Sequence, residues 1–185
     1  IERDGGVWYA RGGTNALVAG MVRLFERLGG TIRLGDPVTR IEIAGDRATG
    51  VTTSSGWHGA AEMVASNGDL MHSYRDLLDH RRGPKVAKGL ARKRWSPSLF
   101  VVHFGVKGVY PDIAHHSILF GPRYKGLLGD IYGGVVPDDF SLYLHHPSIT
   151  DPGMAPPGHS TFYALAPVAH LGKAQADWDG AFGAR

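Results

Sequence analysis

Apolar residues recur at helical spacing between Thr14 and Leu28. Side chains on one face of a helix return every three or four positions, and four apolar residues here follow at steps of four, three and four. Thr14 stands where an N-cap hydroxyl is expected, and Gly29-Gly30 suits a left-handed C-cap. We therefore predict a well-buried helix with an apolar stripe made of Leu17, Met21, Leu24 and Leu28.

Short apolar runs between turn residues predict strands after this helix. The turn signals are Gly45-Asp46 and Ser54-Ser55-Gly56. Pro37 restricts the start of the run that begins at Val38. Proline is tolerated there because it precedes the first residue of the strand. The pattern predicts a small set of strands joined by tight turns, over residues 31–34, 38–43, 48–53 and 57–65.

The pattern changes near residue 70, which indicates a second region. Residues 69–78 carry apolar side chains at helical spacing, and Gly83-Pro84 is expected to break that helix. Buried-type strands rich in Val, Phe and Tyr are predicted over 99–104, 140–145 and 161–165. The fold class is therefore α/β with α+β character, in two domains of residues 1–70 and 71–185.

The composition is that of a globular chain. Of its 185 residues, 43% are hydrophobic and 20% charged, so a sizeable core is possible. The chain has no cysteine, which excludes disulfides, thiolate metal sites and cysteine nucleophiles. No run of about eighteen apolar residues occurs, so we expect no transmembrane helix.

Positive charge is concentrated in one short segment. Residues 81–94 contain seven Lys or Arg residues and no acid. One interpretation is a basic amphipathic segment that contacts anionic lipid headgroups, with Trp95 at the interface. The other is a solvated helix face or loop, which is what charge runs usually are. No aromatic-interleaved motif accompanies the charges, so no nucleic-acid partner is predicted.

Several strings of the sequence match one family over nearly the whole chain. With them the chain resembles the carotenoid desaturase branch of the flavin-dependent amine oxidase superfamily, and within it the bacterial-type phytoene desaturases. The opening strings indicate the superfamily, and the later ones indicate the desaturase branch. They include Arg11-Gly12-Gly13-Thr14, Leu28-Gly29-Gly30, Val64-Ala65-Ser66-Asn67, Phe120-Gly121-Pro122-Arg123-Tyr124 and Asp139-Phe140-Ser141-Leu142-Tyr143-Leu144-His145.

The resemblance implies an architecture and an activity. Residues 1–70 would form part of a Rossmann-like FAD-binding domain, and residues 71–185 a mixed-sheet substrate domain with covering helices. The activity would be FAD-dependent desaturation of an apolar C40 precursor such as phytoene, by a cytoplasmic protein peripheral to the membrane. The Gly-rich segments with which the family begins and ends are missing, so we expect an internal fragment that is inactive alone.

The resemblance also implies site residues. Val38 would bind the FAD adenine through its backbone amide and carbonyl, although it could be an ordinary strand valine. Arg11, with Gly12 and Gly13, would lie near the cofactor, unless it is a surface-loop arginine. Asn67 would lie where the chain passes the cofactor; for the neighbouring Asp69, helix capping is the favoured role. Arg123 is the candidate for the reaction centre, the alternative being a surface arginine in a turn.

Histidine is abundant, but its spacing predicts no metal site. The pairs His115-His116 and His145-His146 are adjacent, and adjacent residues on a strand point to opposite faces. Metalloprotease spacing and the G-x-S-x-G elbow of hydrolases are also missing. Two other functions stay open: a non-catalytic module that binds apolar ligands or lipid, and a related carotenoid isomerase or retinoid saturase.

Overall fold

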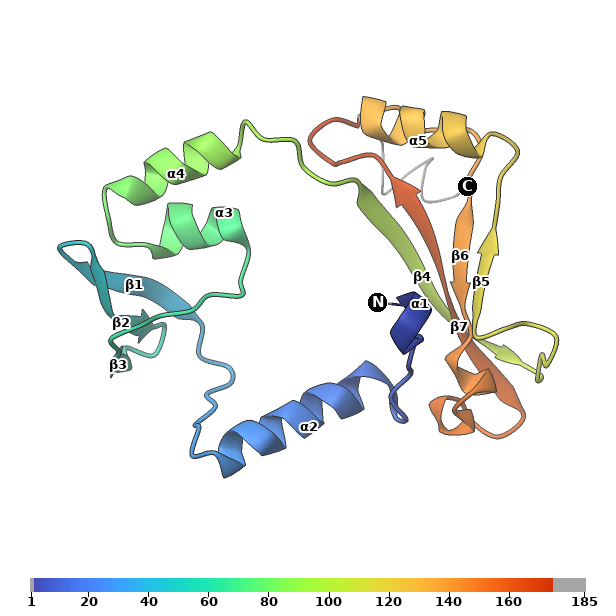
Figure 1. The fold of residues 1–185 in the computed structure, drawn as a ribbon, viewed down its shortest axis with the longest axis horizontal. Helices are drawn as coiled ribbons and strands as arrows, with labels where there is room; N and C mark the ends of the chain where they lie inside the picture. The colour runs from blue at the N-terminus through green and yellow to red at the C-terminus, as the bar shows by residue number, and fades with distance from the viewer. Residues whose placement is uncertain (1, 175–185) are drawn as a thin grey trace. The chain divides into compact units, whose positions relative to one another are not determined.

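The computed structural model describes residues 2–174. The chain divides into two compact units, of which one is Glu26–Arg94 and the other joins Ile1–Phe25 to Trp95–Arg185 (Figure 1). Each unit has its own antiparallel sheet, and helices accompany both sheets. The expected mixed α/β fold class is thus confirmed. The assignment of residues 1–70 and 71–185 to a cofactor and a substrate domain stays a prediction.

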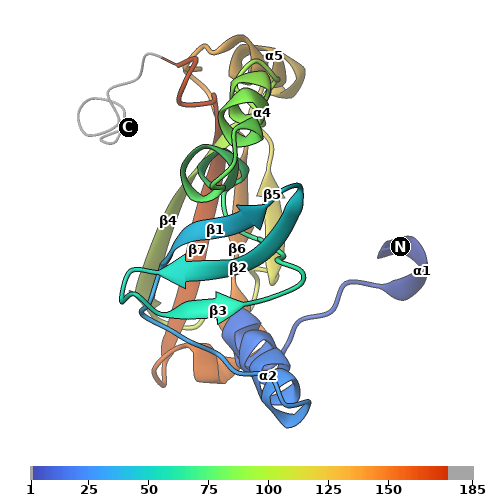
Figure 2. The same cartoon turned by 90° about the vertical axis from the view of Figure 1, so that its left-hand side faces the viewer.

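The sheet of the unit Glu26–Arg94 has the strand order β1-β2-β3 (Figure 2). Strands β1 (Val38–Ala44) and β2 (Arg47–Thr53) confirm two predicted strands, and β3 (His58–Ala60) is shorter than predicted. Gly45 and Gly56 have φ of +62° and +83°, which the two tight turns require. Residues 31–34 form no strand, so that prediction is wrong.

Two helical segments follow this sheet. The predicted helix after Asp69 is present, but as a short α3 (Leu70–His72) that continues as the π-helix η1 (Ser73–Leu77). Asp69 caps it, accepting a 2.7 Å hydrogen bond from the His72 amide. Helix α4 (Arg82–Leu90) contains Gly83-Pro84 in its first turn, so the predicted break is wrong. Proline lacks only an amide that has no partner in a first turn, and it therefore starts this helix.

The predicted helix near the N-terminus is α2 (Gly13–Arg27), which follows a short α1 (Glu2–Gly5). It begins one residue before the predicted cap, so Thr14 lies inside its first turn. Gly29 ends it with φ of +88° and a 2.9 Å hydrogen bond to the Glu26 carbonyl, as predicted. The predicted burial is wrong, because the apolar stripe is exposed: Leu17 57%, Met21 64%, Leu24 48% and Leu28 80%.

The sheet of the other unit has the order β4-β7-β6-β5, and its neighbouring strands are all antiparallel where a mixed sheet was expected. Strands β4 (Ser98–Lys107) and β7 (His159–Val168) contain the predicted runs, and β6 (Leu142–His145) is shorter than the predicted 140–145. Strand β4 was predicted to be buried, but most of its residues are exposed, so that part of the prediction is wrong. The sequence did not predict β5 (His116–Leu119) or helix α5 (Tyr124–Gly133). Two short 3₁₀ helices, η2 (Pro147–Ile149) and η3 (Pro152–Met154), precede β7.

Helix α5 supplies part of this unit's core. Leu127 and Ile131 are buried, and Phe162 and Val168 of β7 are buried as well. Gly134 ends the helix in the left-handed conformation, with φ of +85°. Across residues 2–174, every helix is too short or too polar to cross a bilayer.

Candidate functional site

Val38 lies at the start of β1, an edge strand of its sheet. Its Cα partner across the ladder is Thr53, and the Pro37 carbonyl beside it accepts a 2.8 Å hydrogen bond from the Ser54 amide. Because consecutive strand residues direct their backbone groups to opposite edges, the amide and carbonyl of Val38 face away from β2. The residue is 37% exposed. Its backbone groups are therefore placed for a ligand at the sheet edge.

Gly12 and Gly13 form a tight turn into α2 with φ of +83° and +74°. The Gly12 amide donates a 2.7 Å hydrogen bond to Asp151 Oδ2, and the Gly13 amide donates one of 2.9 Å to the Ala10 carbonyl. Both amides thus already have partners within the chain. Arg11 is exposed beside them. The structure explains the two glycines by the turn itself.

Asn67 lies in the exposed segment between β3 and α3. Its neighbours Ser66 and Gly68 line a pocket of about 270 Å³ against β1 and the π-helix. Asn67 and Val38 belong to the unit Glu26–Arg94, whereas Arg11, Gly12 and Gly13 belong to the other unit. The five cofactor candidates are therefore divided between the two units.

Arg123 joins two of the family strings. It precedes α5 and bonds through Nη2 to Asp139 at 2.6 Å and Asp130 at 3.1 Å. The hydrogen bond to Asp139, followed by that to Asp130, raises the pKa of Arg123 above its ordinary value. Gly121 adds a second link, since its amide donates a 3.0 Å hydrogen bond to the Ser141 hydroxyl. Arg123 therefore fixes the segment at Asp139 against the start of α5.

An apolar pocket of about 260 Å³ lies in the same unit as Arg123. Half of its lining residues are aromatic, and Phe104 stacks on Phe162 with 5.5 Å between ring centroids. Apolar lining of this kind is typical of sites for hydrophobic ligands. The pocket is lined by Phe104, Val106, Tyr110, Ile113, Leu144 and Phe162.

A cluster of histidines is the feature that the sequence did not predict. His115 Nε2 lies 2.9 Å from His145 Nε2, and the rings of His115 and His116 are 4.4 Å apart between centroids. The opposite-face argument fails because His115 lies in a bend before β5, so it is not a strand residue. The antiparallel register then sets His116 directly opposite His145. Only the pairing of β5 with β6 could have revealed this, and β5 was not predicted.

The cluster's electrostatics follow from burial and from the neighbouring imidazoles. Burial lowers the pKa of His145 to about 4, and the charges of His115, His116 and His146 add to that effect. Burial also lowers the pKa of His115, with further contributions from His116 and His146. The pKa of Tyr143 is raised to about 12 by burial and by its hydrogen bond with Tyr163. At neutral pH His115 and His145 are thus uncharged.

The description of the matching family model is flavin containing amine oxidoreductase, and it covers residues 1–180. The chain belongs to this family. It is 62% identical to a lycopene-forming phytoene desaturase of Paracoccus sp. over 180 residues, which are 96% of this chain and 36% of that protein. The corresponding enzyme of Pseudescherichia vulneris is 49% identical over 96% of this chain and 37% of its own length.

A third relative differs in its product. The neurosporene-forming phytoene desaturase of Cereibacter sphaeroides is 46% identical over 184 residues, which are 96% of this chain and 36% of that protein. The chain thus spans about a third of the length of the curated relatives that it matches.

Family membership implies a flavin, and the candidate residues fit one unequally. Val38 fits, because its outward amide and carbonyl can form the paired hydrogen bonds that an adenine edge requires. Gly12 and Gly13 do not fit as phosphate donors in this conformation, since both amides are already bonded within the chain. Arg11 and Asn67 are exposed, and their position alone assigns them no role.

Proposed function

We propose that the protein carrying this chain is an FAD-dependent desaturase of an apolar C40 carotenoid precursor such as phytoene. The observation that carries the proposal is the 62% identity, over 96% of the chain, to a phytoene desaturase. The family supplies the flavin, and the apolar pocket behind Phe104 and Phe162 supplies a surface suited to a hydrocarbon. A pocket of about 260 Å³ holds only a section of such a substrate.

Desaturation removes a hydride and a proton from neighbouring carbons of the hydrocarbon. The flavin, when bound, accepts the hydride, and the proton passes to water or a base. The chain's own residues have to hold the polyene in place and keep water away from it. Aromatic side chains of β4 and β7 suit that task because they present large, rigid apolar surfaces.

Arg123 is proposed to serve the reaction centre by positioning. Its guanidinium is shared between Asp139 and Asp130, so its charge is already balanced by two carboxylates. An arginine whose charge is neutralised by two carboxylates is less suited to stabilise new negative charge than to hold a chain segment in place. The segment that it holds begins at Asp139 and leads directly into β6.

FAD is proposed as the form of the flavin, with Val38 at its adenine. The outward-facing backbone of β1 offers one donor and one acceptor at the sheet edge. Contacts of this kind need no particular side chain, so they agree with a valine at this position. The role of Asn67, Arg11, Gly12 and Gly13 beside the cofactor also stays a proposal.

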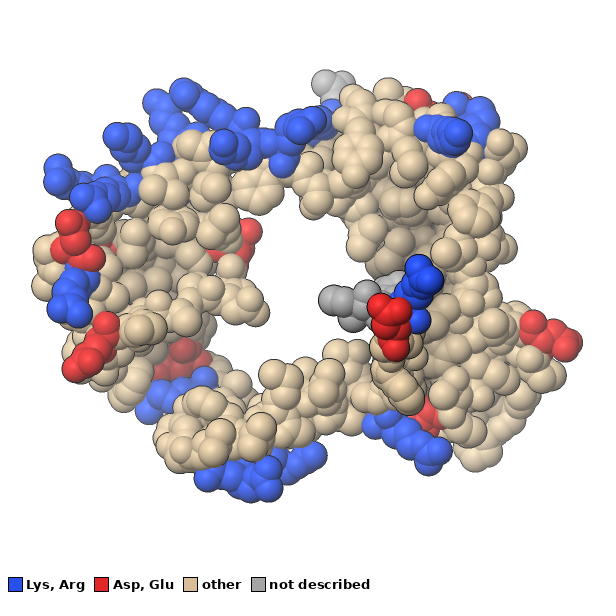
Figure 3. All heavy atoms as spheres, in the orientation of Figure 1, with Lys and Arg blue, Asp and Glu red and all other residues tan. Residues whose placement is uncertain are grey.

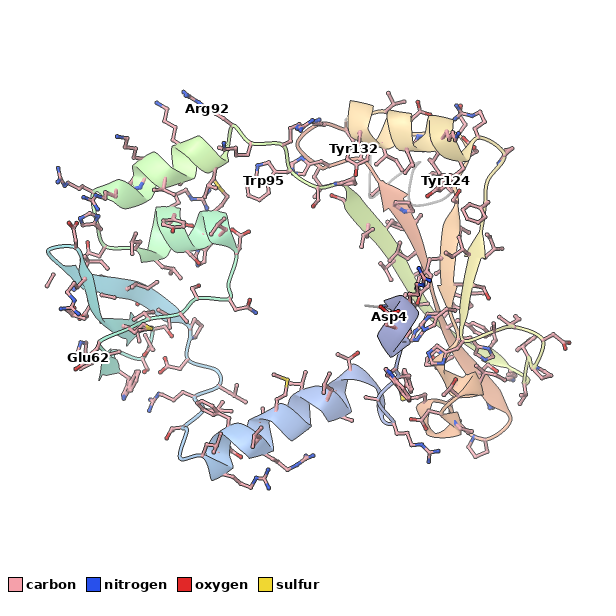
Figure 4. All side chains as sticks on the ribbon, viewed as in Figure 1. Asp4, Glu62, Arg92, Trp95, Tyr124 and Tyr132 are labelled. Atoms are coloured by element: carbon pink, nitrogen blue, oxygen red, sulfur yellow. The ribbon has the colours of Figure 1, made fainter. Side chains whose placement is uncertain are left out.

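Binding to the membrane surface through the basic segment is the second part of the proposal. On α4, Gly83 and Ala87 face inward, whereas Arg81, Arg82, Lys85 and Lys88 are exposed. Lys and Arg side chains gather along this helix in Figure 3, and Arg92 follows it directly (Figure 4). Each Lys or Arg near an anionic membrane contributes about 1 kcal/mol of binding free energy, so a segment with this many cations favours binding to the membrane surface. Such an enzyme would act at the cytoplasmic face of the membrane.

Vesicle sedimentation tests the membrane contact. Replacing Lys85 and Lys88 together by Gln removes two charges, and we expect roughly 30-fold weaker binding to vesicles that contain anionic lipid. The matched control replaces the exposed Lys107 and Lys125 by Gln and should bind like the native protein. Equal binding of both variants would contradict the proposal. Binding that does not depend on salt concentration or on lipid charge would also contradict it.

Pigment analysis tests the desaturase itself. The gene that carries this chain is expressed in bacterial cells engineered to accumulate phytoene, and the extracted carotenoids are separated by chromatography. We expect coloured polyenes with more conjugated double bonds than phytoene. Unchanged phytoene with soluble protein present would refute the proposal, and an isomer without new double bonds would favour a carotenoid isomerase instead.

A further inference from the structure

Three histidines at the paired ends of β5 and β6 converge on one point of the unit that contains the second sheet. His115 lies in the bend before β5, His116 is the first residue of β5, and His145 is the last residue of β6. Each ring offers a nitrogen, and the three nitrogens lie within 4.8 Å of one another. Within residues 2–174 this is the one group of three or more potential ligands with that spacing.

We propose that His115, His116 and His145 bind a divalent transition-metal ion of the zinc class. Three imidazoles with an open fourth position are a donor set that Zn²⁺ accepts in tetrahedral geometry. Ions of intermediate softness such as Zn²⁺, Co²⁺ and Cu²⁺ prefer imidazole nitrogen, whereas Ca²⁺ and Mg²⁺ prefer oxygen. A fourth ligand would be water or a bound molecule.

The spacing of the nitrogens is close to what such an ion needs. Bonds of about 2.0–2.1 Å in a tetrahedron place neighbouring ligand nitrogens roughly 3.3 Å apart. His115 Nε2 and His145 Nε2 are 2.9 Å apart, and the whole set lies within 4.8 Å. Small side-chain rotations bring all three to the required distance. The exposed His116 leaves an access route from solvent.

Hydroxyl groups orient two of the three rings. Thr150 Oγ1 lies 2.6 Å from His115 Nδ1, and the Tyr143 hydroxyl lies 2.5 Å from His116 Nδ1. Ligating histidines usually donate their second ring N–H to such an acceptor, which fixes the tautomer. With Nδ1–H groups donated to the hydroxyls, the Nε2 atoms of His115 and His116 carry the free lone pairs.

His145 provides the third lone pair by a change of tautomer. With His115 Nε2 as the acceptor, the Nε2–H of His145 donates in the pair that the two atoms form, and His145 Nδ1 is buried without a hydrogen-bond partner. A metal ion takes the place of the proton that the two Nε2 atoms share, and that proton moves to His145 Nδ1. The ion therefore binds without charging any of the three rings.

Metal titration of the purified protein tests the site. After chelator treatment, Zn²⁺ is added in a calorimeter, and Co²⁺ is followed by its visible absorption, which is intense for tetrahedral coordination. We expect one ion per chain. His145→Gln and His116→Gln each remove one ligand and should weaken binding by about 100-fold or more, and Tyr143→Phe should weaken it by about 10–100-fold.

The control variant is His159→Gln. His159 is exposed at the start of β7, and its ring bonds to the Pro157 carbonyl outside the cluster. Circular dichroism identifies any variant that fails to fold. If His145→Gln fails to fold, the variant of the exposed His116 still tests the site. Absence of binding by the native protein at about 1 mM Zn²⁺ would overturn the proposal. Equal affinities of His116→Gln and His159→Gln would also overturn it.

Discussion

At the scale of single residues, Asp36 shows how one carboxylate organises a turn. It accepts hydrogen bonds from the Ser55 amide at 3.0 Å, the Ser55 hydroxyl at 2.9 Å and the Thr53 hydroxyl at 2.8 Å. Arg33 adds an ion pair at 3.6 Å and also stacks on Trp57. Desolvation alone would raise the pKa of Asp36, but the hydrogen bonds outweigh it and lower the pKa to about 2.

This shift predicts a pH dependence of stability. A carboxyl whose pKa is lower in the folded state stabilises the fold above its unfolded pKa of 3.8, and that contribution is lost as the pH falls toward 2. Urea unfolding between pH 2 and 6 should therefore show that the free energy of unfolding falls less with decreasing pH in Asp36→Asn than in the native protein. The control variant Asp112→Asn, at an exposed position, should show the same pH dependence as the native protein. The same slope of unfolding free energy against pH in all three proteins would contradict the prediction.

Val38 allows a test at the level of one backbone amide. Because its N–H faces away from β2, Val38→Pro removes a donor at the sheet edge without removing a ladder hydrogen bond. One lost hydrogen bond costs about 0.5–1.5 kcal/mol, so FAD should bind roughly 2- to 13-fold more weakly. Val38→Thr keeps the amide and should bind FAD normally. Unchanged affinity in Val38→Pro would remove this residue from the cofactor site.

At the scale of elements, α4 is fixed to the π-helix by close backbone contact. Gly83 packs against the Tyr74 carbonyl oxygen so closely that a methyl group at Gly83 would overlap it. Gly89, in the same helix, has open space where a methyl group would lie. The two glycines therefore serve different purposes: one permits packing, and the other only costs helix stability.

Two alanine substitutions should separate these purposes. Gly83→Ala should destabilise the unit by about 1–3 kcal/mol, because the helix must move to relieve the overlap. Gly89→Ala should stabilise it by about 0.5–1 kcal/mol through better helix propensity. Urea unfolding followed by circular dichroism measures both. Similar effects of the two substitutions would contradict the packing of α4 seen here.

The elements also show what the sequence could predict. Helix α2 was predicted from its apolar periodicity, β1 and β2 from the turn residues that bound short runs, and β4 and β7 from apolar runs between loops. A helix was only one alternative for the basic segment that contains α4, because Gly83-Pro84 was interpreted as a break, whereas proline is favoured in the first turn of a helix. The histidine cluster was missed because it depends on the register of β5 against β6, which no local pattern encodes.

At the scale of the whole molecule, the proposed function joins two requirements. In the proposal, the flavin would bind at the outward-facing edge of β1 in one unit, and a hydrocarbon would contact apolar side chains of the sheet β4-β7-β6-β5 in the other. Backbone N–H and carbonyl groups would then hold the cofactor, and aromatic side chains would hold the substrate. The family model matches residues 1–180, which include parts of both units.

Anaerobic mixing of the purified full-length protein that carries this chain with phytoene in liposomes tests this account most directly. If the protein is a desaturase, the visible absorption of its bound flavin should fall while the absorption of a longer polyene rises. A fully saturated C40 hydrocarbon should leave the flavin oxidised. A protein that carries no flavin, or whose flavin stays oxidised with phytoene, would contradict the account.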